Sequence, residues 1–295
     1  MSRNKEILLG VLRFVIVFMI TMAISTGIRM IASVVSGEQG APSFVTPAFS
    51  LFGACAQILL LVAYLLLGNQ IPIKNKVMKG LTFSALFWAS AYMPQILGMM
   101  GGTSALLNEN AMSMQTILLD TIGYLLGGTV MGFFLTLREA EPTRPCKNKN
   151  YAAACVTSAI LFPAVLLVLE MLAGAIDKRL LVNHSFAIQE NEFFSFYLVF
   201  YLFQAVSGFL FPVFYRLTAY NGKRRSWLRF ASIYGWMLWT PIVLIVMFFG
   251  IDALPTVVFA GIMLLAMYLD SFVFVKVMER VGLPVKNEQE VANKV

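Results

Sequence analysis

The chain has 295 residues, of which 59% are hydrophobic and 13% are charged, and its mean hydropathy is +0.78. This charged share is about half of that in a typical soluble domain and leaves too little polar surface to cover a globule in water. The composition therefore excludes an ordinary soluble protein. The net charge of +7 would suit a nucleic-acid partner, but the positions of the basic residues fit membrane topology instead, so we expect no nucleic-acid binding.

Eight apolar segments follow one another along the chain, and each is long enough to cross about 30 Å of hydrocarbon as a helix. Lipid offers no partners for backbone polar groups, and the alternation of a barrel strand is absent, so helices are predicted. The segments cover approximately residues 8–32, 45–68, 77–100, 113–137, 151–174, 194–215, 228–250 and 254–278. The predicted fold class is all-α: a polytopic integral membrane protein with eight transmembrane helices in the lipid bilayer.

The first segment resembles a signal peptide in its basic start, but it is longer than a usual apolar signal region. Its stretch from Phe14 to Ile28 is flanked by Arg13 and Arg29. Long arginine side chains can extend along a helix toward water. The sequence therefore favours a retained membrane helix.

The basic residues fix the predicted orientation. If the N-terminus is cytoplasmic, every Lys and Arg except Arg29, Lys178 and Arg179 falls on the cytoplasmic side of the eight predicted segments. Such a bias orients membrane proteins with their basic loops inside. We expect both termini in the cytoplasm and a location in the cell membrane, most simply the inner or plasma membrane of a bacterium.

The polar connection REAEPTRPCKNKN, residues 138–150, divides the chain into two membrane halves. Half A covers residues 1–140 and half B residues 141–295 with a short cytoplasmic tail, and each holds four predicted helices of one membrane domain. An ungapped offset of 147 positions aligns Gln57 with Gln204 and Pro94 with Pro241. This favours a parallel 4+4 repeat, with its axis along the membrane normal. The alternative is eight helices of similar composition without duplication.

The same offset aligns Phe83 with Phe230 and Phe87 with Tyr234. Gln57 and Gln204 fall near the predicted bilayer centre. One interpretation is that their amides form interhelical hydrogen bonds. The other is a midplane polar site for a substrate, as in transporters built from repeats.

Three ionisable residues fall near the outer ends of their segments: Arg29, Asp120 and Glu170. They are predicted to form either interhelical ion pairs or an outward-facing charged cluster that receives a polar or cationic ligand. Gly123 and Gly127 follow Asp120 at helical spacing. Small residues at this spacing let a second helix approach closely, so this helix face is predicted to pack against another helix.

Asp270 lies deeper, in the cytoplasmic part of the last segment, and Arg13 lies at a comparable depth in the first. A buried charge is expected to have a partner of opposite sign. The sequence therefore predicts a buried Arg13–Asp270 ion pair.

Prolines interrupt four of the segments, at Pro94, Pro163, Pro212 and Pro241. Each removes a backbone donor and crowds the preceding turn, which predicts a kink. Kinks expose carbonyl groups that can line a cavity. The simpler interpretation is that proline is common in membrane helices.

The sequence contains no P-loop, no zinc-protease motif and no hydrolase elbow. A single histidine and three scattered cysteines offer no metal site, so we expect neither enzyme activity, nor a metal, nor a cofactor. Two functions fit: a transporter or permease that moves a small molecule or ion, and a non-catalytic accessory, sensor or immunity-type subunit of an envelope complex. Active transport would need an ion gradient or a partner membrane or ATPase subunit. A polar cavity between the halves would favour transport, and a tightly packed interior would favour the second function.

Overall fold

The computed structural model describes residues 3–36, 47–68, 71–92, 114–135, 148–181, 193–218, 226–236 and 253–279. Within these ranges the chain is helical apart from short connections and contains no strand. The long helices are α1 (Arg3–Ser36), α2 (Pro47–Leu67), α3 (Lys76–Phe87), α5 (Met114–Phe134), α6 (Asn148–Ile176), α8 (Phe193–Thr218) and α10 (Ala253–Glu279). Residues 226–236 are also helical.

Two short elements adjoin the long helices. The π-helix η3 (Trp88–Tyr92) continues α3 directly, and the 3₁₀-helix η4 (Lys178–Leu180) follows α6. At the start of α3 the side chain of Asn75 accepts hydrogen bonds from the backbone N–H groups of Val77 and Met78. These bonds satisfy two donors that the first turn leaves open and explain why the helix begins there.

Four helices are long and apolar enough to cross a membrane: Ile7–Ile28, Asn150–Ile176, Phe196–Thr218 and Leu254–Glu279. Two shorter apolar helices cover Gln57–Leu67 and Thr121–Phe134. The α1 side chains Leu8, Val11 and Met19 are exposed, as are Ile160 and Val168 of α6. Such apolar surfaces suit contact with lipid tails. The prediction of an all-helical membrane protein is confirmed, whereas eight spans and the repeat stay predictions.

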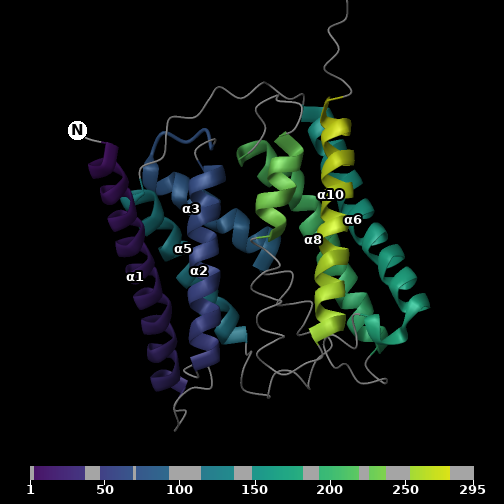
Figure 1. The fold of residues 1–295 in the computed structure, drawn as a ribbon, viewed down its shortest axis with the longest axis horizontal. Helices are drawn as coiled ribbons and strands as arrows, with labels where there is room; N and C mark the ends of the chain where they lie inside the picture. The colour runs from purple at the N-terminus through teal and green to yellow at the C-terminus, as the bar shows by residue number, and fades with distance from the viewer. Residues whose placement is uncertain are drawn as a thin grey trace, which may run out of the picture.

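The helices lie side by side in two groups (Figure 1). α1 packs against α2 and α5, and α3 packs against α5. In the second group, α6 packs against α8 and α10. The groups meet where α8 contacts α3 and η3. Most of the connection expected to separate the halves lies outside the described residues, and α6 begins at Asn148 within it.

Glycines permit the closest crossing in the first group. A side-chain carbon on Gly80 of α3 would lie 2.5 Å from the backbone nitrogen of Gly132 and would collide with the carbonyl oxygen of Gly128, both in α5. On the other side of α5, Gly127 lies against Thr21 of α1 and Gly123 lies against Ile28. The expected close packing of these small residues against another helix is confirmed.

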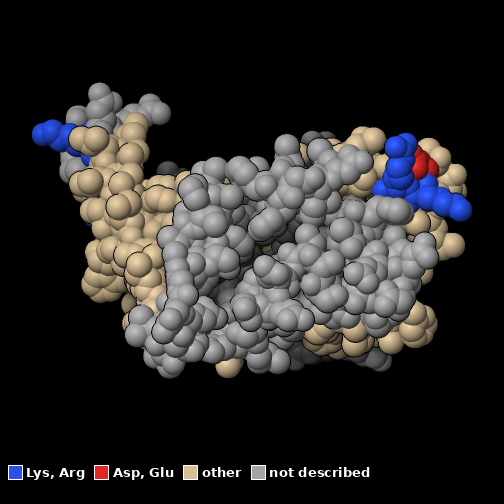
Figure 2. Space-filling view, turned by 90° about the horizontal axis from the view of Figure 1, so that it is seen from below, with Lys and Arg blue, Asp and Glu red and all other residues tan. Residues whose placement is uncertain are grey.

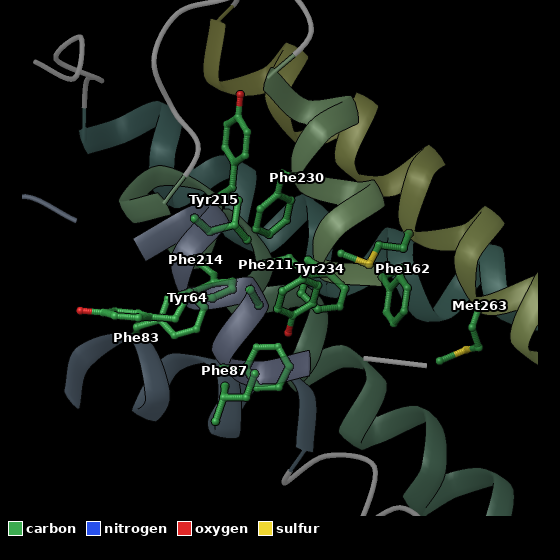
Figure 3. Close-up of a cluster of buried hydrophobic side chains, with 14 of the residues drawn as sticks. Tyr64, Phe83, Phe87, Phe162, Phe211, Phe214, Tyr215, Phe230, Tyr234 and Met263 are labelled. Atoms are coloured by element: carbon green, nitrogen blue, oxygen red, sulfur yellow. The ribbon is translucent and has the colours of Figure 1, made fainter. Parts of the chain in front are cut away.

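An aromatic cluster fills the contact between the two groups (Figure 3). The ring of Tyr234 has its centroid 5.1 Å from that of Phe214, 5.4 Å from Phe211 and 5.8 Å from Phe87. All four rings are buried. Edge-to-face aromatic contacts of this kind add to the stabilisation from burial. The described part of this junction is thus packed with side chains.

Candidate functional site

Asp270 of α10 is the most deeply placed carboxyl group in the described part of the chain. Its side chain is 0% exposed, and the hydroxyl of Ser158 in α6 donates a hydrogen bond of 2.6 Å to Asp270 Oδ2. The hydroxyl and the carboxyl come from two helices that pack against each other. Burying an ionisable group is costly unless it is bonded, so the pair is a candidate functional site.

Several buried polar atoms on α10 and α8 have no hydrogen-bond partner. They are Asp270 Oδ1, the hydroxyl of the adjacent Ser271, and the hydroxyl of Ser207 in α8. Gly208, the neighbour of Ser207, faces the backbone of Ser158 so closely that a side-chain carbon there would lie 3.0 Å from the Ser158 carbonyl carbon. The glycine therefore brings α8 against the Ser158–Asp270 pair. Unpartnered buried polar atoms are rare in stable interiors, which marks this place as unusual.

The predicted Arg13–Asp270 ion pair is wrong. α1 and α10 lie toward opposite edges of the molecule, with α2, α3 and α8 between them (Figure 1). Arg13 is exposed on α1. Asp270 instead faces α6, where Ser158 is its partner. Equal depth in two segments did not imply proximity, because α1 packs against half A helices and α10 against half B helices.

Glu170 lies at the other end of α6, where its carboxylate is 1% exposed. Two tyrosines of α8 donate hydrogen bonds to it: Tyr197 at 3.0 Å to Oε1, and Tyr201 to Oε2. The two tyrosine rings are stacked on each other, with centroids 6.1 Å apart. The side chains of Arg29 and Asp120 lie outside the described residues, so the predicted outer cluster is described at Glu170 alone. These two hydrogen bonds tie α6 to α8 at this end of the helix pair.

The two predicted midplane glutamines are both buried. Gln204 of α8 is 0% exposed and Gln57 of α2 is 9% exposed. Gln57 Oε1 has no hydrogen-bond partner. The helices that carry them belong to different groups: α2 packs against α1 and α3, and α8 against α6. A symmetric substrate site formed by both amides stays a prediction.

Polar residues of α8 follow one face of the helix. Tyr197, Tyr201, Gln204 and Gly208 are spaced three or four positions apart, which places them on the same side. The first two contact Glu170 and the last contacts Ser158, and both of these residues belong to α6. Polar groups thus line the contact between α6 and α8 from Glu170 to Ser158, the partner of Asp270. We call these four residues of α8, together with Glu170 and Ser158 of α6, the α6–α8 interface.

A second polar contact joins the two groups of helices. The hydroxyl groups of Ser90, in the π-helix η3, and Tyr234 are 2.6 Å apart and share a hydrogen bond. The Arg229 guanidinium donates to the carbonyl oxygen of Leu66 at 2.9 Å. π-helical turns within α-helices often occur at functional positions. These two hydrogen bonds join half A to half B among the residues that the structure describes.

Two of the predicted kink positions lie inside continuous helices, Pro163 in α6 and Pro212 in α8. Pro94 and Pro241 lie outside the described residues. Pro163 follows Ser158 by little more than one turn on the same helix. The predicted kinks themselves remain untested.

The described residues contain no group of three or more His, Cys, Asp or Glu side chains that would hold a metal ion. Sequence reasoning missed Ser158, Tyr197 and Tyr201 as partners of the buried carboxyls. A signal existed for the tyrosines, since they align with Gln204 on one face of an apolar helix. Ser158 had no such signal, because serine is common in membrane helices.

Figure 2 shows the described Lys and Arg residues toward two edges of the molecule. The exposed ion pair between Arg179 and Asp177, 2.7 Å long, belongs to the region around η4. No family model matches the chain, and no curated protein or solved structure shows significant similarity to it.

Proposed function

We propose that the protein is a multi-pass transporter of the permease type that moves a small molecule or ion across the cell membrane. The observation that carries the proposal is Asp270, a 0% exposed carboxyl group inside the apolar helix Leu254–Glu279. Ionisable residues inside membrane helices are costly, and they mark substrate pathways, ion pathways and proton relays. Asp270 Oδ1 has no hydrogen-bond partner, which fits a carboxyl group that exchanges its partner during a transport cycle.

The proposal includes eight spans arranged as two four-helix halves. Equivalent helices support it, because in each half the first helix packs against the second and the last: α1 against α2 and α5, and α6 against α8 and α10. Equivalent aromatic pairs support it too. Phe83 and Phe87 are stacked at 19°, and Phe230 and Tyr234 at 13°. Parallel repeats around an axis along the membrane normal are an established transporter design.

The direct test uses purified protein in proteoliposomes on a solid-supported membrane. Rapid exchange to amino acids, sugars, organic cations or inorganic ions, one class at a time, would produce a transient current for a transported class. We expect one class to give a current that is lost in Asp270→Asn and kept in Asp177→Asn, which changes an exposed ion pair near η4. Absence of current with every class would contradict the proposal.

The second candidate is an accessory, sensor or immunity-type subunit, and the packed junction between the halves favours it. Phe87, Phe211, Phe214 and Tyr234 fill that place with buried rings. A packed interior suits a protein that binds a partner chain rather than a solute. Covalent cross-linking in cells followed by purification distinguishes the two, because an accessory subunit would carry another membrane or ATPase subunit in fixed ratio and would give no solute current alone.

A further inference from the structure

We infer that the α6–α8 interface is a proton pathway from Glu170 to Asp270, and that the proton is the ion that drives transport. The inference deepens the proposed function and rests on it, since it names the coupling ion of that transporter. It places the proton-binding group at Asp270 Oδ1. Binding converts a carboxylate to a carboxylic acid, and no other bond changes.

The two ends of the pathway are carboxyl groups fixed by α6. Glu170 accepts hydrogen bonds from Tyr197 and Tyr201 of α8, and Asp270 accepts one from Ser158 of α6. Glu170 and Ser158 are separated by twelve positions on α6, which corresponds to about 18 Å along a helix. The carboxyls are thus too far apart for direct transfer and need groups between them.

Polar groups of α8 that are buried or partly buried occupy this interval. Tyr201, Gln204 and Ser207 follow one another between the Glu170 contact and the Gly208–Ser158 crossing. Gln204 and Ser207 are 0% exposed. A hydroxyl both donates and accepts, so tyrosine and serine can pass a proton, and bridging water can join groups that do not touch. The Ser207 hydroxyl has no partner, and the adjacent Gly208 lies against the Ser158 backbone, so Ser207 suits such a relay.

The chemistry favours a proton over a metal cation. Hard cations take six or more oxygen ligands, whereas a proton needs a single acceptor atom. Asp270 Oδ2 already accepts from Ser158, which leaves Oδ1 as the open position. Among the residues that the structure describes, Asp270 belongs to no group of three or more Asp, Glu, His or Cys side chains that could hold a metal ion.

The charged and titratable groups around Asp270 have other partners or lie elsewhere. Arg216 of α8 stacks on Tyr151 of α6, and its guanidinium carbon lies 4.5 Å from the centroid of the tyrosine ring. On α10 itself, the Lys276 ammonium lies 5.8 Å from the exposed Phe272 ring. The remaining groups on the packed elements are Cys155, Tyr215, Tyr234, Arg229, Tyr268, Glu279 and, at the far end of α10, Asp177, Lys178 and Arg179. Asp270 makes no salt bridge with any described residue, so a proton would be its natural counter-charge.

Infrared spectroscopy of the purified full-length protein in lipid nanodiscs tests the proton site without requiring transport. We expect the carbonyl band of a protonated carboxylic acid that is lost in Asp270→Asn. The band should return at a different frequency in Asp270→Glu, which keeps a carboxyl group if the asparagine variant misfolds. Ser158→Ala should shift the band because it removes the hydrogen bond to Oδ2. Asp177→Asn is the control and should leave the band unchanged.

The rate at which deuterium from heavy water replaces the carboxyl proton, followed as a shift of the same band, tests the pathway. Gln204→Leu and Glu170→Gln should each slow its deuterium shift roughly tenfold, which corresponds to about 1.4 kcal/mol in the barrier. Ser232→Ala is the control, since Ser232 bonds Tyr268 outside the α6–α8 interface. The inference would be overturned if the carboxylic acid band were absent at every pH. It would also be overturned if Gln204→Leu and Glu170→Gln left the rate of deuterium exchange unaltered. Solute currents driven by sodium instead would overturn the proton but leave the transporter intact.

Discussion

Phe87 and Tyr234 are equivalent under the offset of 147 positions, and their rings are in edge-to-face contact with centroids 5.8 Å apart. In a symmetric arrangement a residue touches its own equivalent only close to the symmetry axis. This contact therefore supports the proposed axis between the halves. It lies next to the Ser90–Tyr234 hydrogen bond, which crosses the same boundary.

Truncation of Phe87 is expected to be among the most damaging changes in the chain. Phe87→Ala should lower the free energy of unfolding by about 3–5 kcal/mol, because it opens a cavity among rings that cannot close it. Tyr234→Phe, which keeps the ring and loses the Ser90 bond, should cost about 1 kcal/mol. Unfolding by denaturant in micelles, followed by tryptophan fluorescence, measures both. Leu198→Ala on the exposed face of α8 is the control, and an equal loss there would refute the role of the junction.

Gly80 should tolerate no side chain, in contrast to Gly10. Gly80→Ala would press a carbon against the backbone of Gly128 and Gly132 and should destabilise by about 1–3 kcal/mol. Gly10 has nothing within 4 Å of an added carbon, so Gly10→Ala should be neutral or slightly stabilising. Thermal unfolding of both variants in the same detergent decides the comparison. Equal midpoints would mean that α3 and α5 can move apart at little cost.

The positions of several helices could be predicted from the sequence because apolar length is a local property. The structure gives α2 as Pro47–Leu67 and α6 as Asn148–Ile176, close to the predicted segments 45–68 and 151–174. The glycine face of α5 was also predictable, because helical spacing puts Gly123 and Gly127 on one side. These features depend on residues within one helix.

Partners across helices were not predictable in the same way. The depth of Arg13 and Asp270 was read from their segments, but the choice between Arg13 and Ser158 depends on which helices are neighbours. That choice is made by packing, here by the contact of α10 with α6 that brings Ser158 to Asp270. The offset of 147 positions carries one piece of tertiary information, since it pairs Phe87 with Tyr234, whose rings are in contact.

Removal of the Ser158 hydroxyl should weaken the fold measurably. Ser158→Ala leaves Asp270 Oδ2 buried without its donor, which should cost about 1–3 kcal/mol. Ser207→Ala is a matched control, because it removes a buried hydroxyl that has no partner and should cost little or stabilise. Denaturant unfolding of the two variants gives the comparison. A larger loss for Ser207→Ala would indicate that the polar contacts are assigned to the wrong residue.

The Glu170 contact should appear as coupling between two helices. Tyr201→Phe and Glu170→Gln each remove part of one hydrogen bond. Their combined effect should be smaller than the sum of the single effects by roughly 0.5–3 kcal/mol, the range for residues in direct contact. Tyr268→Phe combined with Glu170→Gln is the control, because Tyr268 bonds Ser232. Strict additivity for Tyr201 would show that the bond contributes nothing to stability.

The predicted orientation places Lys178 outside and Lys5 inside the cell, and both side chains are exposed. In a background with Cys55, Cys146 and Cys155 replaced by alanine, Lys178→Cys should react with a membrane-impermeant maleimide on intact cells, and Lys5→Cys only after lysis. The reason is the basic bias, which holds almost every Lys and Arg in the cytoplasm. The reverse labelling pattern would show that the protein has the opposite orientation in the membrane. Because α6 ends beside Lys178, it would also move Glu170 to the cytoplasmic end of the pathway and reverse the direction in which protons reach Asp270.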